Sequence, residues 1–238
     1  MNPLTTTLEA VPSLEDFLTD RPAHAQATEW VADALQQAMD AGALVPGSKL
    51  AEEHLAGVLD VSRNTLRQAF TILEGQNLVE RIPNRGVFVV SPAGEQIREM
   101  FVARWAIQSA AIDYTPAGAI GDARAALEDA QAAEARGSVA GMAGANQAFH
   151  RALVAAAGSE RLNRAMASVL AEMRLLFFSQ VTVPGFHAPY VKRNCELLEL
   201  VEAGQREQAQ AFLWAYLEDS RAYFMQGAQG QAGGQVTL

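Results

Sequence analysis

The chain has 238 residues, half of them hydrophobic, and a formal net charge of −9. Its length suffices for one large or two modest domains, and its negative charge argues against a protein that coats nucleic acid by bulk attraction. The single cysteine, Cys195, excludes an intrachain disulfide framework. The N-terminus lacks a basic signal segment, and no apolar run approaches the ~20 residues of a membrane-spanning helix. We therefore expect a soluble, cytoplasmic protein with no membrane partner.

The two ends of the chain differ in composition from the rest. Residues 1–25 contain three prolines and no sustained periodicity, so we interpret them as an N-terminal extension. Residues 227–238 are rich in glycine and glutamine, which predicts a flexible tail.

Between these ends, residues 26–92 predict a small domain of three short helices followed by a strand pair. Apolar residues recur at helical spacing in the first part, and β-branched residues flank a turn in the second. The expected elements are a helix capped by Thr28 that stops near residues 41–42, a helix over 51–59, a helix capped by Ser62 that ends at Leu73 or Gly75, and strands over 78–82 and 87–91.

The third predicted helix presents two arginines on one face. Arg63 and Arg67 are four residues apart and so lie on the same side, opposite the apolar Phe70 and Leu73. Arginine can hold guanine through two parallel hydrogen bonds, and the major groove has room for one helix. An isolated pair would indicate only a solvated helix face. The order of helix, helix, tight link, arginine-bearing helix and basic-tipped hairpin instead indicates a winged helix-turn-helix.

Further residues complete the predicted DNA-binding surface. Ser62, Asn64 and Thr65 lie at the start of the third helix, where they can hydrogen-bond phosphates beside the free backbone N–H groups. At the turn between the strands, Arg85 can reach the neighbouring minor groove or a phosphate. Gly86 allows the backbone to approach closely there.

After Pro92 the sequence predicts helices throughout, which indicates an all-α domain over residues 95–226. The expected helices cover residues 95–113, 118–136, 139–157, 160–181, 190–203 and 206–225. The predicted fold class is mainly α, with an N-terminal winged helix-turn-helix and a C-terminal all-α helical bundle.

The segments PGSKL, VSR, LRQA and PNRGVFV follow one another in the first third of the chain. In this order they resemble the GntR family of bacterial transcription regulators. The resemblance implies that Arg63 and Arg67 contact bases, and it places the other residues named above at the DNA backbone or the wing tip. One departure is Glu53, because the family often has an arginine there. A carboxylate repels phosphate, so this contact is lost or the operator differs.

The helical half resembles the FCD effector domain of the FadR-type branch, through VARWAIQSAA, NQAFHRALVAAAGSERL and NCELLELVEAGQREQAQAFLWAYL. Many members of that branch hold a divalent metal through an aspartate and three histidines. The matching positions here are Asn146, His150, Asn194 and Tyr216. Three of the four are neutral groups that bind transition metals poorly, so we predict no tightly bound metal and no other cofactor.

The same four side chains can instead line a polar pocket that binds a small molecule by hydrogen bonds. Arg104 matches a family arginine and could neutralise an anionic effector. An equally weighted alternative is that these residues only satisfy one another inside the bundle. His187 precedes Pro189 and is expected in a surface loop, while Cys195 fits either an inert thiol or a redox sensor.

Together these resemblances imply a sequence-specific transcriptional regulator, a repressor, that acts as a homodimer on a palindromic DNA operator. An organic acid or related metabolite in the helical domain would modulate its operator affinity. The chain lacks a nucleophile elbow, a P-loop and an HExxH motif, and Glu52 and Glu53 are interpreted as an exposed helix face, so we expect no enzyme.

Two alternative functions are compatible with the same division into a winged domain and a helical bundle. One is a metabolite-binding or enzyme-like bundle with a vestigial winged domain, and the other is a winged domain that only contacts proteins. The two arginines and the PNRG wing argue against both.

Overall fold

The structure is a computed structural model, and it describes residues 13–17, 27–116, 118–178 and 184–232. Contacts along the chain divide it after Ser91 into an N-terminal unit and a C-terminal unit. Within the described ranges, no helix combines the length and the apolar character needed to cross a membrane.

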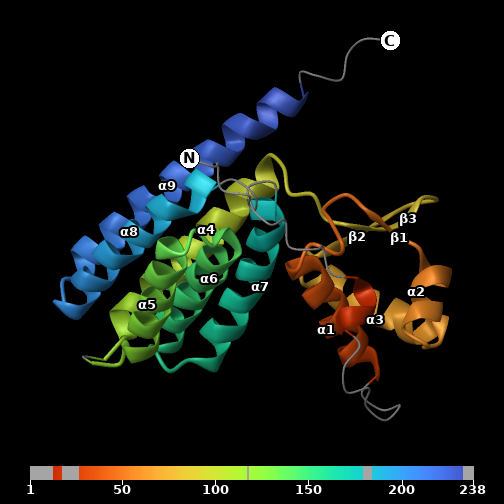
Figure 1. Cartoon of the computed structure of the whole chain (residues 1–238), viewed down its shortest axis with the longest axis horizontal. Coiled ribbons are helices and arrows are strands. Elements are labelled where there is room, and N and C mark those ends of the chain that lie inside the picture. Colours follow the sequence, from red (N-terminus) through yellow and green to blue (C-terminus); the bar gives the residue numbers. More distant parts are fainter. Residues whose placement is uncertain (1–12, 18–26, 117, 179–183, 233–238) are drawn as a thin grey trace, which may run out of the picture. The chain divides into compact units, whose positions relative to one another are not determined.

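The N-terminal unit combines short helices with a small antiparallel sheet (Figure 1). Its described elements are the 3-10 helix η1 (Leu14–Phe17), the helices α1 (Ala27–Asp40), α2 (Glu52–Val58) and α3 (Arg63–Gly75), and the strands β1 (Lys49–Leu50), β2 (Val79–Ile82) and β3 (Gly86–Val89). η1 falls in the predicted N-terminal extension and contacts α1. Residues 1–12 and 18–26 of that extension lie outside the described part of the chain.

The described strands form one sheet in the order β1-β3-β2, with both pairs antiparallel. The sequence predicted the β2–β3 hairpin but missed β1, in which Lys49 pairs with Phe88 and Leu50 with Val87. Two residues are too few to show strand alternation. The hairpin turns through Asn84 and Gly86, whose φ angles of 62° and 111° lie in the left-handed region that these residue types tolerate.

Helix α3 has one buried face and one exposed face. Leu66, Ala69, Phe70 and Leu73 are buried, and α3 packs against α1. The predicted N-cap is confirmed, because the Ser62 hydroxyl accepts a hydrogen bond from the Thr65 backbone N–H at 3.0 Å.

The cap predicted for the first helix was wrong. α1 begins at Ala27, and Thr28 lies inside its first turn, where the hydroxyl donates to Oε1 of Gln68 at 3.2 Å. The side chain therefore ties α1 to α3 and does not cap α1.

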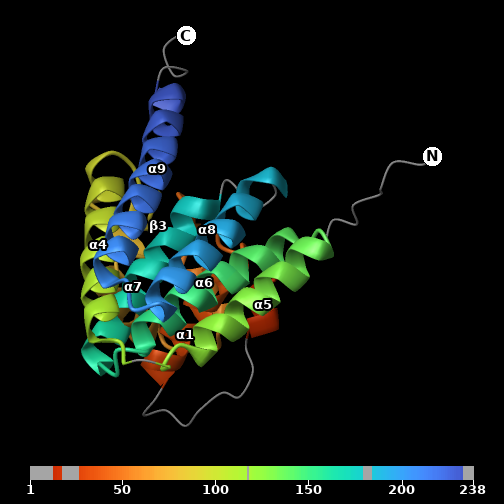
Figure 2. The ribbon, with the colours of Figure 1, turned by 90° about the vertical axis from the view of Figure 1, so that its left-hand side faces the viewer.

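The C-terminal unit is a bundle of helices that run alongside one another (Figures 1 and 2). Its described helices are α4 (Glu95–Tyr114), α5 (Gly121–Ala135), α6 (Val139–Ala155), α7 (Glu160–Phe177), α8 (Pro184–Glu202) and α9 (Arg206–Ala232). The predicted class, a mainly α chain with a winged helix-turn-helix and a helical bundle, is confirmed.

Helix α6 is the centre of this bundle, since it contacts α4, α5, α7 and α8. Its Phe149 and Leu153 are fully buried in the main hydrophobic core. Burying a side chain of this size stabilises the fold by about 1.5–3 kcal/mol. The same packing carries the neighbouring polar residues of α6 into the interior.

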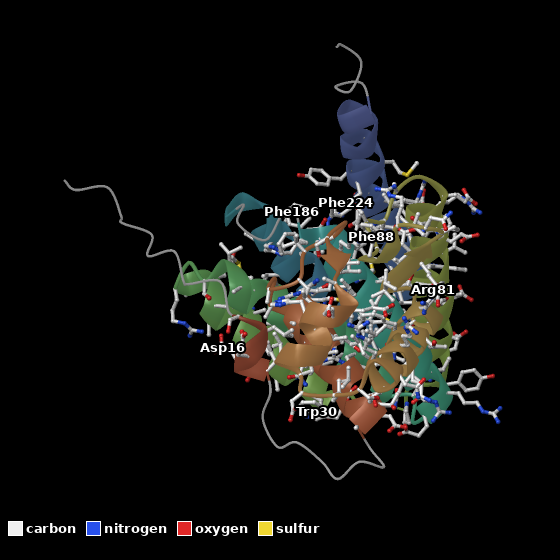
Figure 3. The ribbon with its side chains drawn as sticks, turned by 90° about the vertical axis from the view of Figure 1, so that its right-hand side faces the viewer. Asp16, Trp30, Arg81, Phe88, Phe186 and Phe224 are labelled. Atoms are coloured by element: carbon white, nitrogen blue, oxygen red, sulfur yellow. The ribbon has the colours of Figure 1, made fainter. Side chains whose placement is uncertain are left out.

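Aromatic side chains join α7, α8 and α9. Phe186 of α8 lies beside Phe224 of α9, with ring centroids 5.8 Å apart (Figure 3). Phe177 at the end of α7 meets Phe224 edge to face at 4.7 Å. Such tilted pairs are the favoured arrangement of aromatic rings, and they hold the start of α8 against the bundle.

Several helix boundaries differ from the prediction. The helix predicted over 160–181 ends at Phe177, and residues 179–181 lie outside the described part of the chain. The larger differences are in α8 and α9. α8 begins at Pro184 and contains Pro189, whereas the sequence suggested a start at residue 190. Pro184 is the first residue of the helix, a position where the missing N–H of proline is not needed. Pro189 lies inside the helix, beyond its first turn. α9 continues through Ala232, into the predicted flexible tail, and its last turns extend beyond the other helices of the unit (Figures 1 and 2). Residues 233–238 lie outside the described part of the chain.

Candidate functional sites

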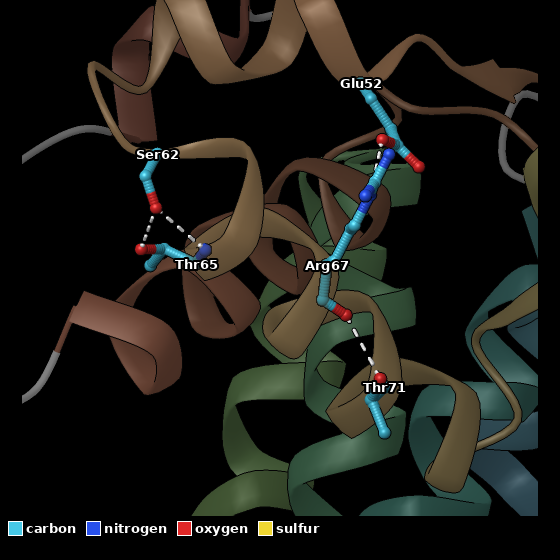
Figure 4. Close-up of polar contacts among 5 residues, drawn as sticks. All are labelled: Glu52, Ser62, Thr65, Arg67 and Thr71. Carbon is cyan, nitrogen blue, oxygen red and sulfur yellow. Dashed lines mark hydrogen bonds and ion pairs between the residues drawn. The ribbon is translucent and has the colours of Figure 1, made fainter.

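Both arginines predicted to contact bases are exposed on α3, on the side opposite its buried apolar face. Each is paired with a carboxylate of α2. Nη2 of Arg63 donates to Oε1 of Glu53 at 2.8 Å, and Nε of Arg67 donates to Oε2 of Glu52 at 2.9 Å (Figure 4). The interpretation of these two glutamates as a plain solvated face missed both ion pairs.

The start of α3 presents the other predicted backbone contacts. Ser62 and Asn64 are exposed, and Thr65 is partly buried. The hydroxyl oxygens of Ser62 and Thr65 are 2.8 Å apart, so the Ser62 side chain serves both the helix cap and this neighbour (Figure 4).

The wing tip adds further positive charge. Arg85 is exposed, with its guanidinium carbon 5.4 Å from the centre of the Phe88 ring. Gly86 lies so close to Lys49 that a Cβ atom on the glycine would come within 3.2 Å of Cε of the lysine. Sequence reasoning overlooked Lys49. Its place in the PGSKL segment and in β1 makes it a candidate phosphate contact.

In the C-terminal unit, four side chains from α4, α6 and α9 form a chain of hydrogen bonds. Nε of Arg104 donates to Oε1 of Gln108 at 3.0 Å. Because that oxygen accepts, the amide nitrogen of Gln108 faces Nδ1 of His150, at 2.8 Å. Nε2 of His150 then donates to the Tyr216 hydroxyl at 3.4 Å. The chain is buried throughout.

Burial shapes the protonation of this cluster. Desolvation, with the nearby charge of Arg104, holds the pKa of His150 well below its ordinary value of 6.5. Desolvation likewise raises the pKa of the Tyr216 phenol and lowers that of the Arg104 guanidinium. The lowered pKa keeps the imidazole neutral near pH 7. Because the Gln108 amide donates to Nδ1, the proton of the neutral ring is on Nε2.

The remaining predicted effector residues pair with each other. Nδ2 of Asn194 donates to Oδ1 of Asn146 at 2.7 Å. Asn146 and Arg104 also line a small cavity of about 30 Å³. Of the five predicted effector residues, Arg104 and Asn146 line this cavity, whereas His150, Asn194 and Tyr216 do not. Hydrogen bonds nevertheless connect Asn194 to Asn146 and His150 to Tyr216.

Two residues of this region were missed or misplaced from the sequence. His187 was expected in a surface loop, but it is buried on α8 and lines the cavity. The helix predicted to begin at residue 190 begins at Pro184, so residue 187 is helical. Gln108 was not considered, although its position four residues after Arg104 places both on one helix face.

Cys195 of α8 is partly buried, and its sulfur accepts a hydrogen bond from the Gln131 amide at 3.5 Å. Desolvation raises the pKa of the thiol, which lowers its thiolate fraction and so its reactivity.

The divalent metal implied by the family resemblance does not fit these side chains. Both ring nitrogens of His150 are engaged, by Gln108 and Tyr216. The other matching positions offer two amides and a phenol whose pKa is raised, and the Arg104 cation lies beside them. No group of three histidine, cysteine, aspartate or glutamate side chains suited to a metal occurs in the described part of the chain.

Comparison with known families identifies the two units. Residues 27–89 match the model for bacterial regulatory proteins of the gntR family, and residues 99–219 match the FCD domain model. The chain belongs to the GntR family. It is a DNA-binding transcriptional regulator with a winged helix-turn-helix followed by an FCD domain.

Individual relatives agree with this assignment. A GntR transcriptional regulator from Rhodococcus sp. RHA1 is 36% identical, with a TM-score of 0.76 over 83% of this chain and 97% of that one. An HTH-type regulator from the TAR-I ttuE-ttuC' intergenic region of Agrobacterium vitis is 30% identical over 131 residues, which are 52% of this chain and 77% of the relative. McbR/YncC of E. coli shares the fold at 19% identity, with a TM-score of 0.69 over 84% of this chain and 98% of that one.

Proposed function

We propose that this GntR-family regulator is a homodimeric repressor of a palindromic operator, and that an organic acid or related metabolite bound in the FCD domain releases it from DNA. Arg63 and Arg67 contact bases in the major groove. Ser62, Asn64 and Thr65 lie at the DNA backbone, and the wing residues enter the neighbouring groove. The FCD domain has a binding role and no catalytic one.

The exposure of Arg63 and Arg67 supports the DNA contacts. Both side chains are exposed on one face of α3; the contact with Glu52 uses Nε of Arg67, and the contact with Glu53 uses one terminal nitrogen of Arg63. One helix with two base-contacting arginines makes a small footprint. A two-fold dimer doubles it and matches a palindrome.

The observation that carries the effector proposal is the uncompensated charge of Arg104. This guanidinium is only 3% exposed, and among the described residues no carboxylate pairs with it. Its Nη1 contacts the sulfur of Met173 at 3.3 Å, and its Nη2 is buried without a hydrogen bond of normal geometry. Its stabilising polar neighbours include the phenols Tyr216 and Tyr190, which are neutral. A buried cation without a counter-ion is costly, so the carboxylate of a bound metabolite would relieve that cost.

The cavity beside Arg104 is too small for an organic acid, so binding such an effector requires a change in the conformation of the bundle. A space of about 30 Å³ holds water, whereas an organic acid has to displace lining side chains such as Met173 and Phe177. A ligand that fits only the displaced arrangement shifts the bundle toward it. Through the dimer, this shift would change the distance between the two recognition helices.

The proposed DNA contacts are tested by measuring DNA affinity with fluorescence anisotropy. The probe is a palindromic duplex that the wild-type protein enriches from a random library. Arg63→Ala with Arg67→Ala should lower affinity by at least about thirtyfold, since each bidentate base contact contributes about 1–3 kcal/mol. Arg161→Ala with Arg164→Ala on exposed sites of α7 is the charge-matched control. Unchanged binding by the first pair would refute the recognition-helix assignment.

The proposed binding of an effector beside Arg104 is tested by a thermal-shift screen of small organic acids, sugar acids and amino acids. A binding acid should raise the melting temperature and release the duplex. Arg104→Met should abolish both effects, while the exposed Arg151→Met on α6 should leave both intact. A ligand response that survives Arg104→Met would remove Arg104 from the site.

A further inference from the structure

The two recognition arginines are held by neighbouring carboxylates in different ways. Glu52 and Glu53 are adjacent in the first turn of α2. The Glu52 side chain is 28% exposed and bonds Nε of Arg67, whereas the Glu53 side chain is 86% exposed and bonds Nη2 of Arg63. The identity of the bonded nitrogen decides what each arginine has left to offer DNA.

A guanidinium has two edges with a pair of parallel donors. One edge is formed by Nη1 and Nη2, and the other by Nε and Nη2. The contact from Glu52 engages Nε of Arg67 and leaves the terminal edge whole (Figure 4). The contact from Glu53 engages Nη2 of Arg63, which carries one N–H on each edge. This carboxylate therefore occupies a donor of one edge and places its negative charge beside a terminal nitrogen of Arg63.

The Glu52–Arg67 and Glu53–Arg63 ion pairs also differ in the burial of their carboxylates. A half-buried carboxylate on Nε restricts the long Arg67 side chain before DNA arrives, which reduces the entropy lost on binding. A fully solvated carboxylate such as that of Glu53 is weakly held, and exposed ion pairs of this kind contribute little stability.

We propose that Glu52 is a positioning residue that presents Arg67 to a base, and that Glu53 is a displaceable counter-ion that restrains Arg63 and lowers DNA affinity. This inference rests on the proposed base contacts of the two arginines. It assigns opposite effects to two neighbouring residues of equal charge.

The test uses the full-length protein and the duplex enriched from a random library. Glu52→Ala should weaken binding about tenfold, within the range of one bidentate base contact. Glu53→Ala should strengthen binding about twofold to fivefold, the range of an exposed ion pair. This gain should shrink as salt is raised, because the pair is solvent-screened. Equal strengthening by both variants would show only a bulk-charge effect and overturn the proposal.

Double-mutant cycles show whether each glutamate acts through its own arginine. In an Arg67→Ala background, Glu52→Ala should have no further effect, and the same holds for Glu53→Ala in an Arg63→Ala background. Undiminished effects in these backgrounds would overturn the assignment.

Glu52→Asp covers the case in which Glu52→Ala unfolds α2. It keeps the charge but shortens the reach toward Nε, so affinity should still fall, while Glu53→Asp should not weaken binding. Wild-type affinity in Glu52→Asp would overturn the positioning role. The proposed function fails separately, and only if the Arg63→Ala, Arg67→Ala variant binds this duplex as wild type does.

Discussion

Gln108 and His150 are joined by a 2.8 Å hydrogen bond between the amide nitrogen of one and Nδ1 of the other. The Gln108 oxygen is occupied by Arg104, which fixes the direction of this bond. His150 is therefore held as one neutral tautomer, between an amide donor and the Tyr216 hydroxyl. An imidazole in this state has no lone pair left for a metal and resists protonation.

The depressed pKa of His150 predicts a specific pH dependence of stability. Below about pH 6.5 the unfolded chain takes up a proton at this residue while the folded chain does not. The free energy of unfolding should then fall with falling pH, by up to about 1.4 kcal/mol per unit. His150→Gln, which keeps one donor and one acceptor, should remove this contribution. Urea unfolding of the wild-type protein and of His150→Gln at pH 7.5, 6.5 and 5.5 measures this difference. If the free energy of unfolding changed equally with pH in both proteins, the prediction would be contradicted.

Metal content is a second prediction. Elemental analysis of protein purified without chelators should find well below one Zn, Ni or Mn per chain, because His150 is engaged on both ring nitrogens. The triple variant Asn146→Asp, Asn194→His, Tyr216→His restores the ligand types of the family resemblance and is the positive control for metal uptake. Stoichiometric metal on the wild-type protein would show that the cluster rearranges to release His150.

Ser62 allows the cap and the DNA contact to be separated. Ser62→Ala removes the acceptor for the Thr65 N–H and should cost about 1 kcal/mol of stability. Ser62→Asp keeps a good N-cap but places a negative charge at the expected phosphate, so it should retain the melting temperature and bind DNA several-fold more weakly. Wild-type DNA affinity in Ser62→Asp would place Ser62 away from the DNA backbone.

The two faces of α3 should respond differently to truncation. Phe70 is fully buried, and Phe70→Ala should destabilise the N-terminal unit by about 3–5 kcal/mol. The nearby Thr71 is exposed and only donates to the Arg67 carbonyl at 3.1 Å, so Thr71→Ala should change stability by no more than about 0.5 kcal/mol. Urea unfolding followed by circular dichroism distinguishes them. Equal losses would mean that α3 is not packed as described.

Local features were predictable because their causes lie within a few residues. The Ser62 cap needs only an N–H three positions on, and the shared face of Arg63 and Arg67 needs only the helical repeat. The β2–β3 hairpin follows from a turn of asparagine and glycine between apolar runs. The family resemblance depends on the same local features, so the DNA-binding unit could be predicted from the sequence.

Features that depend on contacts between residues far apart in the sequence could not be predicted from the sequence. The start of α8 at Pro184 depends on Phe186 packing against α7 and α9, so His187 was placed in a loop when it is buried. The pairing of β1 with β3 depends on a partner far along the chain.

The sequence by itself determined the order of elements, the arginine-bearing face of α3 and the drift of the family's metal ligands to neutral groups, because residue type and short spacing decide these. Only the tertiary structure decided that Glu52 and Glu53 hold the two arginines, and that Arg104 lies buried beside a cavity without a carboxylate partner among the described residues. The physical reason is that hydrogen-bond partners, burial and the resulting pKa shifts depend on which helices meet, and that is a property of packing.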